Sequence, residues 1–202
     1  MRALLSTVLG GLLLAGCGQE TSAPPAPAPS TVAERPQGPA VVGPILVTFS
    51  ENGAGEINGE TPLTTRSIAA VFPDASVETA LHEEAGVEII TVRRPDGLVL
   101  DLHPGVDPER VGEIIGRAGP VTGPLGEKLG ADWATMGFEP ADCRRGQDDM
   151  SHTLICYRPG EPLLGYVFDL SAFEGPDDQI PEPDVLEAIA RLSAFVWTAA
   201  PN

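Results

Sequence analysis

Residues 87–103 have the sequence VEIITVRRPDGLVLDLH, and this stretch predicts the core of the fold. Two runs rich in branched aliphatic residues, Val87–Arg93 and Leu98–His103, flank the turn Pro95-Asp96-Gly97. Such a pattern is typical of a β-hairpin. Alternate residues of a strand point to opposite faces, so Leu98, Leu100 and Leu102 are expected in the core, with Val99, Asp101 and His103 opposite.

Before the hairpin, a short helix and a further extended segment are expected. Thr61-Pro62 is a helix start signal, and Ile68, Val71 and Phe72 fall on one helical face before Pro73. Residues 75–82 are then expected to be extended. After the hairpin, a strand is predicted with Ile114 on one face and these residues alternating on the other: Val111, Glu113, Ile115 and Arg117.

The second half of the chain repeats this order at an offset of 66 residues, with Phe138 matching Phe72. Apolar residues at 125, 129, 133 and 136 predict a helix, and the turn at residues 158–162 joins the segments 153–157 and 163–170. Pro183 is expected to begin a last helix containing Val185, Leu186, Ile189 and Leu192, before a strand at 195–197. Because identity between the halves is thin, chance similarity is the alternative.

These signals predict an α+β fold, an antiparallel sheet with short helices. The domain spans residues 45–202 and consists of two tandem helix-plus-hairpin units, about 45–118 and 119–202. Trp133 and Trp197 are expected in its core.

The N-terminal sequence predicts where the protein is located in the cell. One basic residue, Arg2, precedes an apolar run that is too short to span a bilayer, and the run ends in Leu14-Ala15-Gly16-Cys17. This ending resembles the lipobox of bacterial lipoproteins, which implies a signal peptide at 1–16 and acylation of Cys17. An ordinary signal peptide that contains a cysteine is the alternative.

A Pro- and Ala-rich segment with almost no large apolar side chain follows, so residues 17–44 are expected to form the lipidated cysteine and a disordered tether. Gly18 is not Asp, the residue that retains lipoproteins in the inner membrane. The resemblance therefore implies a lipid anchor at the periplasmic face of the outer membrane.

Composition excludes some partners. The chain has 29 Asp and Glu against 12 Lys and Arg, a net charge of −17. This charge argues against nucleic acid and against direct adsorption to anionic lipid. An acidic, solubilising surface explains the excess.

Two cysteines remain once Cys17 is assigned to lipid. Cys143 and Cys156 form an even pair in an oxidising compartment, which favours a structural disulfide. Their spacing is not the C-x-x-C of a redox site, and neither zinc nor haem ligand spacing is present.

The strongest enzyme-like feature is Asp101 with His103, which share one strand face and could form half of a nucleophilic triad. No G-x-S-x-G motif accompanies them. A solvated polar strand face explains the pair without catalysis, so we predict that the chain is not an enzyme.

Other polar clusters carry weaker signals. Metal ligands could come from Asp148, Asp149, His152, His82, Glu83 and Glu84, but their spacing favours no metal, and no cofactor is predicted. The loops at 52–59 and 174–179 could display a binding edge, although turn chemistry alone explains them. The candidate binding loop is Glu174, Gly175, Pro176 and Asp177.

An ordered set of motifs resembles an uncharacterised Gram-negative lipoprotein family, a domain of unknown function. The matching residues are Gly53-x-Gly55-x-Ile57-Asn58-x-x-Thr61-Pro62, Phe72-Pro73, Cys143, Cys156, Tyr166-Val167-Phe168, Gly175-Pro176-Asp177 and Trp197. Asp178 and Glu174 depart from the family pattern, at positions where Gly and an aromatic residue are usual. The resemblance implies a lipid-anchored envelope protein and assigns no catalytic residue.

The sequence therefore predicts a non-catalytic interaction or envelope-maintenance module that meets a periplasmic or envelope protein partner. A periplasmic hydrolase using Asp101 and His103 is the alternative.

Overall fold

The hairpin predicted over residues 87–103 is present in the computed structural model, which describes residues 46–82 and 86–201. Strands β4 (Val87–Arg93) and β5 (Val99–Pro104) pair antiparallel. The backbone N–H of Arg94 donates to the carbonyl of Leu98 across the turn, and Gly97 has a φ of 89°. Glycine adopts this left-handed conformation without steric cost, which explains its place in the turn.

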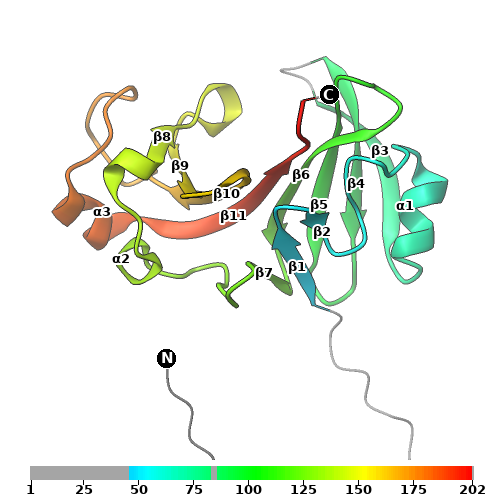
Figure 1. Cartoon of the computed structure of the whole chain (residues 1–202), viewed down its shortest axis with the longest axis horizontal. Coiled ribbons are helices and arrows are strands. Elements are labelled where there is room, and N and C mark those ends of the chain that lie inside the picture. Colours follow the sequence, from blue (N-terminus) through cyan, green and yellow to red (C-terminus); the bar gives the residue numbers. More distant parts are fainter. Residues whose placement is uncertain (1–45, 83–85, 202) are drawn as a thin grey trace, which may run out of the picture. The chain divides into compact units, whose positions relative to one another are not determined.

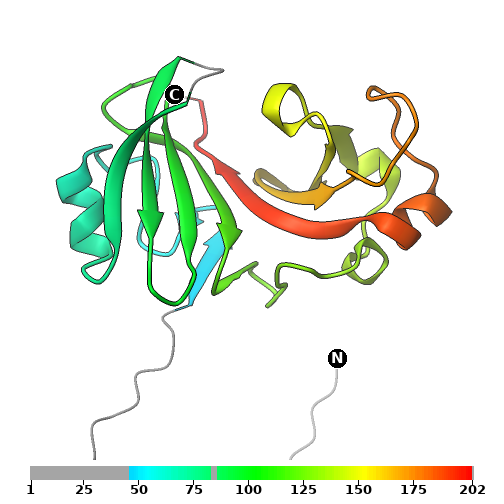
Figure 2. The same cartoon turned by 180° about the vertical axis from the view of Figure 1, so that it is seen from behind.

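An eight-stranded antiparallel sheet is built around this hairpin (Figures 1 and 2). Its strand order is β3-β4-β5-β6-β11-β10-β9-β8, and a second, three-stranded sheet has the order β2-β1-β7. The other strands are β1 (Val47–Ser50), β2 (Gly53–Ala54), β3 (Ser76–His82), β6 (Val111–Ala118), β7 (Val121–Thr122), β8 (Cys143–Arg145), β9 (Thr153–Arg158), β10 (Glu161–Asp169) and β11 (Arg191–Thr198). The helices are α1 (Thr65–Val71), α2 (Trp133–Met136) and α3 (Pro183–Ile189), with 3₁₀ turns η1 (Pro140–Asp142) and η2 (Asp148–Met150).

The expected antiparallel sheet with short helices is confirmed. Strands dominate, so α+β describes the fold only roughly. Each half of the chain contributes four of the eight strands, and the halves meet where β6 pairs with β11. None of the helices described is long and apolar enough to cross a membrane.

The first helix begins three residues later than predicted. Thr64 is its N-cap, because the Thr64 side-chain oxygen accepts from the backbone N–H of Ser67 at 3.1 Å. The Thr61-Pro62 signal instead belongs to a connection, in which Pro62 forms a bridge with Arg110.

The helix expected from the apolar residues at 125, 129, 133 and 136 is largely wrong. Only Trp133–Met136 is helical, and Leu125 is 75% exposed. Gly126 and Gly130 have φ values of 88° and 84°, which no α-helix accommodates. These glycines turn the chain and break the apolar period.

Two strand assignments also change. Leu192 belongs to β11, which is longer than the predicted strand at 195–197, although α3 does begin at Pro183. Val111 lies in the core together with Ile114, because the pairing of β5 with β6 shifts register between His103 and Pro104.

One hydrophobic core spans both halves of the sheet, and Trp133 and Trp197 are buried in it at 4% and 3% exposure. The predicted disulfide is confirmed. Cys143 on β8 pairs directly with Cys156 on β9, and their Cα atoms are 4.0 Å apart.

Candidate functional site

Asp101 lies on β5, on the face of the sheet opposite the main core. Its carboxylate accepts from the Thr91 hydroxyl at 2.8 Å and pairs with Arg117 Nε at 2.9 Å. The residue is only 7% exposed, so the expectation of a solvated strand face is wrong at this position. Both carboxylate oxygens hold neighbouring strands together.

The same face of the sheet carries a second apolar cluster, formed by Ile115, Ile155, Val167, Ala194 and Val196. Ile115 pairs with Asp101 across β5 and β6. Gly165 allows these side chains to close in, since a Cβ there would lie 2.7 Å from Val196 and 2.9 Å from Ile155. The face is therefore partly a packed layer, contrary to the simple alternation of apolar and polar sides.

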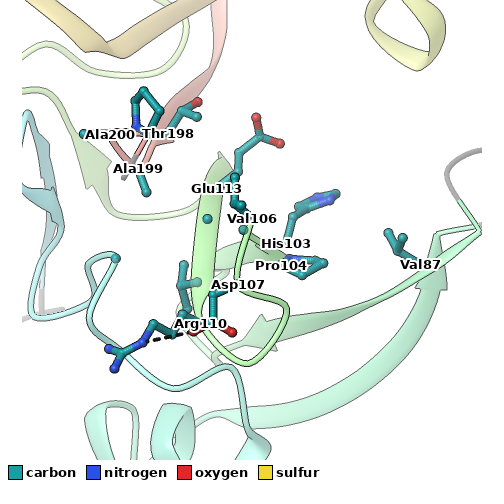
Figure 3. A pocket seen from close by; sticks show the side chains of 15 residues that line it. Val87, His103, Pro104, Val106, Asp107, Arg110, Glu113, Thr198, Ala199 and Ala200 are labelled. Atoms are coloured by element: carbon teal, nitrogen blue, oxygen red, sulfur yellow. Dashed lines mark ion pairs between the residues drawn. The ribbon is translucent and has the colours of Figure 1, made fainter.

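His103 lines a cavity of about 660 Å³ at one end of the first half of the sheet (Figure 3). The cavity lies among the end of β5, the start of β6 and the end of β11, and Glu113 and Thr198 also line it. The connection from β5 to β6 forms one wall and carries Val106, which is 94% exposed. Arg110 braces this connection through ion pairs with Glu60 at 2.8 Å and Asp107 at 3.4 Å.

The structure brings His82 and His103 together, which the sequence reasoning missed. Their ring centroids are 5.4 Å apart in an edge-on arrangement. His82 is on β3 and His103 on β5, with β4 between them. Only the strand order places these residues side by side, so no local motif could have signalled the contact.

His103 and Glu113 line the same cavity, so the His103 imidazole and the Glu113 carboxylate could exchange protons with a bound molecule. Nucleophilic catalysis needs more: a hydroxyl or thiol within hydrogen-bond reach of the base. Thr198 supplies the hydroxyl among the described cavity residues, and the hydrogen bonds of Asp101 go to Thr91 and Arg117.

The predicted binding loop lies near the opposite edge of the large sheet, beside β8. Arg145 Nε donates to the carbonyl of Asp177 at 2.7 Å, and Arg145 Nη2 donates to the carbonyl of Ser151 at 2.8 Å. His152 Nδ1 lies 4.0 Å from the Asp177 carboxylate. A cavity of about 650 Å³ separates this loop from β8, and Arg144 and Asp178 lie on its two sides. The loop is exposed at Glu174 and Asp177, and Arg145 anchors it.

The dispersed metal-ligand candidates do not converge. His82 lies near one edge of the eight-stranded sheet and His152 near the other. Within residues 46–82 and 86–201, no three His, Cys, Asp or Glu side chains form a group suited to a metal ion. Glu83 and Glu84 lie outside the described residues, as do Cys17 and the rest of the predicted signal peptide and tether.

A buried polar cluster was not expected from the sequence. Glu127 accepts from Arg158 Nη2 at 2.8 Å and from the Tyr166 hydroxyl at 3.3 Å. The Arg158 guanidinium stacks over the rings of Tyr166 and Phe138. Burial raises the pKa of the Tyr166 hydroxyl to about 12. The cluster ties the connection after β7 to the β9–β10 hairpin.

Fold and site together define a β-sheet protein in which Asp101 bridges neighbouring strands and His103 lines a surface cavity. The profile of the family described as "Protein of unknown function (DUF1131)" matches residues 43–199, and the chain belongs to this family. Membership of a family without an assigned function agrees with the resemblance found in the motifs.

Among solved structures, the chain is similar to the uncharacterized protein yfeY from Escherichia coli. The two share 19% sequence identity, with a TM-score of 0.57 over 76% of this chain and 99% of that one. At this identity the likeness shows a shared fold. No match was found among the curated proteins.

Proposed function

We propose that this chain is a lipoprotein of the outer membrane, anchored at the periplasmic face through Cys17. The observation that carries the proposal is the sequence Leu14-Ala15-Gly16-Cys17 at the end of an apolar run. The Pro- and Ala-rich residues 17–44 then tether the domain to the lipid. One acyl chain binds membranes only marginally, so stable anchoring requires the multiple acylation that a lipobox implies.

Two substitutions test the lipid anchor and the choice of membrane separately. Cys17→Ser should abolish incorporation of labelled palmitate and release the protein into the soluble periplasmic fraction. Gly18→Asp should keep the label and move the protein to the inner membrane. Label retained by the Cys17→Ser chain would contradict the anchor, and a Gly18→Asp chain left in the outer membrane would contradict the sorting.

The folded domain is, in this proposal, a non-catalytic interaction or envelope-maintenance module for a periplasmic or envelope protein partner. Support comes from Asp101, whose carboxylate is already committed to Thr91 and Arg117. The exposed Val106 on the connection from β5 to β6 and the exposed loop at Glu174 and Asp177 offer surfaces for contact. Because the two contacts of Asp101 use both of its carboxylate oxygens, they weaken the alternative of a hydrolase using Asp101 and His103.

Complementation of a deletion strain separates these two functions. Asp101→Asn and His103→Ala should each restore the wild-type envelope phenotype, provided that far-UV circular dichroism shows a folded protein. Loss of complementation by a folded, lipidated His103→Ala protein would favour the hydrolase. Substituting Glu174 and Asp177 together tests the exposed loop as the contact surface instead.

The proposal includes a tandem duplication, with units of about 45–118 and 119–202. The sheet order supports it, because the β4–β5 and β9–β10 hairpins occupy corresponding positions on either side of the β6–β11 pair. Superposing residues 61–103 on 125–170 should place hairpin on hairpin. Different strand directions after superposition would make the 66-residue offset a coincidence.

A further inference from the structure

Strand β3 is the outermost strand of the first half of the large sheet, and among the described strands it pairs with β4 alone (Figure 1). Glu78, Thr79, Ala80 and Leu81 are all exposed, and Leu81 reaches 63%. The pairing of β3 with β4 runs over seven residue pairs without a bulge. Proteins usually protect such an edge with charged residues, especially Lys, with Pro or with a bulge. The sequence SVETALH has no Lys, Pro or bulge, and Glu78 is the one Asp, Glu, Lys or Arg in it.

The opposite edge of the sheet is closed differently. Strand β8 has only three residues, and the disulfide fixes it to β9. Arg145 at its end also holds the carbonyls of Ser151 and Asp177. Strand addition is therefore favoured at β3 and disfavoured at β8.

We propose that two copies of this chain pair antiparallel through β3, about a two-fold axis that passes through Thr79. A closed two-fold contact uses the same surface on both copies. The axis is perpendicular to the sheet, so each residue faces one from the same side of the partner's strand. Registers can then shift only in steps that centre a single residue on the axis.

The register centred on Thr79 suits the sequence of β3. It pairs all seven residues, places Leu81 against Val77, and sets Glu78 against Ala80. Centring on Glu78 would bring two carboxylates directly opposite each other, which is destabilising. Centring on Ala80 would leave Ser76 and Val77 outside the paired strand. For a domain with a strong negative charge, the Thr79 register avoids a like-charge contact across the axis.

One face of β3 is only partly covered around Thr79. A cavity of about 520 Å³ separates this part of β3 from the start of α1, and Thr65, Thr79 and Ile90 line it. Thr79 and Leu81 are on the side of β3 that faces α1, and both remain exposed. Pairing would cover Leu81 with apolar surface and satisfy the outward backbone groups of the edge.

Cysteine cross-linking in the full chain tests both the contact and its register. Thr79→Cys should give a covalent dimer after mild oxidation of intact envelopes, because directly paired Cα atoms lie about 4.5–5.5 Å apart. The matched control is Ala80→Cys, which is also exposed but faces Glu78 of the other copy. We expect at least about tenfold more dimer from Thr79→Cys on non-reducing gels, with the wild-type chain run in parallel to report native cysteines.

A second pair of variants tests the apolar contact. Leu81→Asp should reduce the Thr79→Cys dimer several-fold, whereas Leu125→Asp, at another exposed leucine away from β3, should leave it unchanged. Equal cross-linking at residues 79 and 80, or none at 79, would overturn the proposal. So would a monomeric mass for the purified wild-type chain in analytical ultracentrifugation at every concentration tested.

Discussion

At the residue scale, the most constrained chemistry is the cluster of Glu127, Arg158 and Tyr166. Glu127 Oε2 also accepts from the backbone N–H of Leu125 at 2.9 Å, so both carboxylate oxygens are used. The side chains of Glu127 and Arg158 are 8% and 23% exposed. Removing one partner of such a pair leaves a charge that water compensates poorly.

Glu127→Ala should therefore lower the free energy of unfolding by about 3 kcal/mol. Urea denaturation measures the change, and Glu127→Gln should cost less because the amide oxygen still accepts from Arg158. As a control, Glu56→Ala removes an exposed carboxylate and should change stability by less than about 0.5 kcal/mol. A Glu127→Ala protein as stable as this control would show that the cluster does not stabilise the fold.

The raised pKa of Tyr166 predicts a dependence of stability on alkaline pH. The pKa of the hydroxyl rises from an ordinary 10.0 to about 12, because burial disfavours the phenolate. Folding therefore favours the protonated form. The corresponding stability is complete below pH 10 and is lost as the pH rises toward 12.

Tyrosinate absorbance measures this directly, since the chain has two tyrosines. The step that disappears in Tyr166→Phe should have its midpoint near pH 12, with circular dichroism confirming that the protein is still folded at the start of the step. If the missing step instead lies near the ordinary pKa, the hydroxyl is not buried in solution.

At the element scale, local sequence signals predict the bounds of the strands well. They predict the burial of each strand face less well. Strands β4, β5, β9 and β10 lie within two residues of their predicted bounds, because Pro- and Gly-containing turns mark both hairpins. The helix expected from Leu125 failed, since an apolar period says nothing of the backbone that Gly126 and Gly130 adopt. Helix propensity and turn chemistry competed there, and the turns prevailed.

Long-range pairing explains what the sequence could not predict about the candidate site. The burial of Asp101 depends on Thr91 from β4 and Arg117 from β6, and the His82–His103 contact depends on strand order. Alternation along a strand identifies which residues share a face. It cannot tell whether that face is packed or solvated.

The absence of a side chain at Gly116 helps to position strand β1 against the large sheet. A Cβ at Gly116 on β6 would lie 2.7 Å from the ring of Phe49 on β1. Phe49 is fully buried and stacks on Phe195 with ring centroids 5.5 Å apart. The glycine therefore allows the small sheet to dock on the large one.

Gly116→Ala should cost about 1–3 kcal/mol of stability through overpacking, although alanine is otherwise preferred to glycine in a strand. Phe49→Leu should partly relieve the clash, so the double variant should be more stable than the sum of the two single changes predicts. Strictly additive losses in urea denaturation would place the cost in the backbone rather than at the Phe49 ring.

At the scale of the whole domain, the two halves share one sheet and one core. Pairing of β6 with β11 joins them, and a single cluster includes Leu100 from the first half and Leu164 from the second. Neither half can expose its side of the core without disrupting the other. We therefore expect residues 46–201 to unfold as one cooperative unit, despite the repeated strand order.

A distant reporter tests this cooperativity. In a Trp197→Phe background, Trp133 on α2 is the sole tryptophan, and it lies in the second half. Leu100→Ala creates a cavity in the first half and should lower stability by about 3 kcal/mol. If the domain unfolds as one unit, the Trp133 fluorescence transition must move to lower urea by the full amount, together with circular dichroism and with an unchanged slope. A Trp133 transition that stays in place while circular dichroism splits into two steps would show that the halves unfold independently.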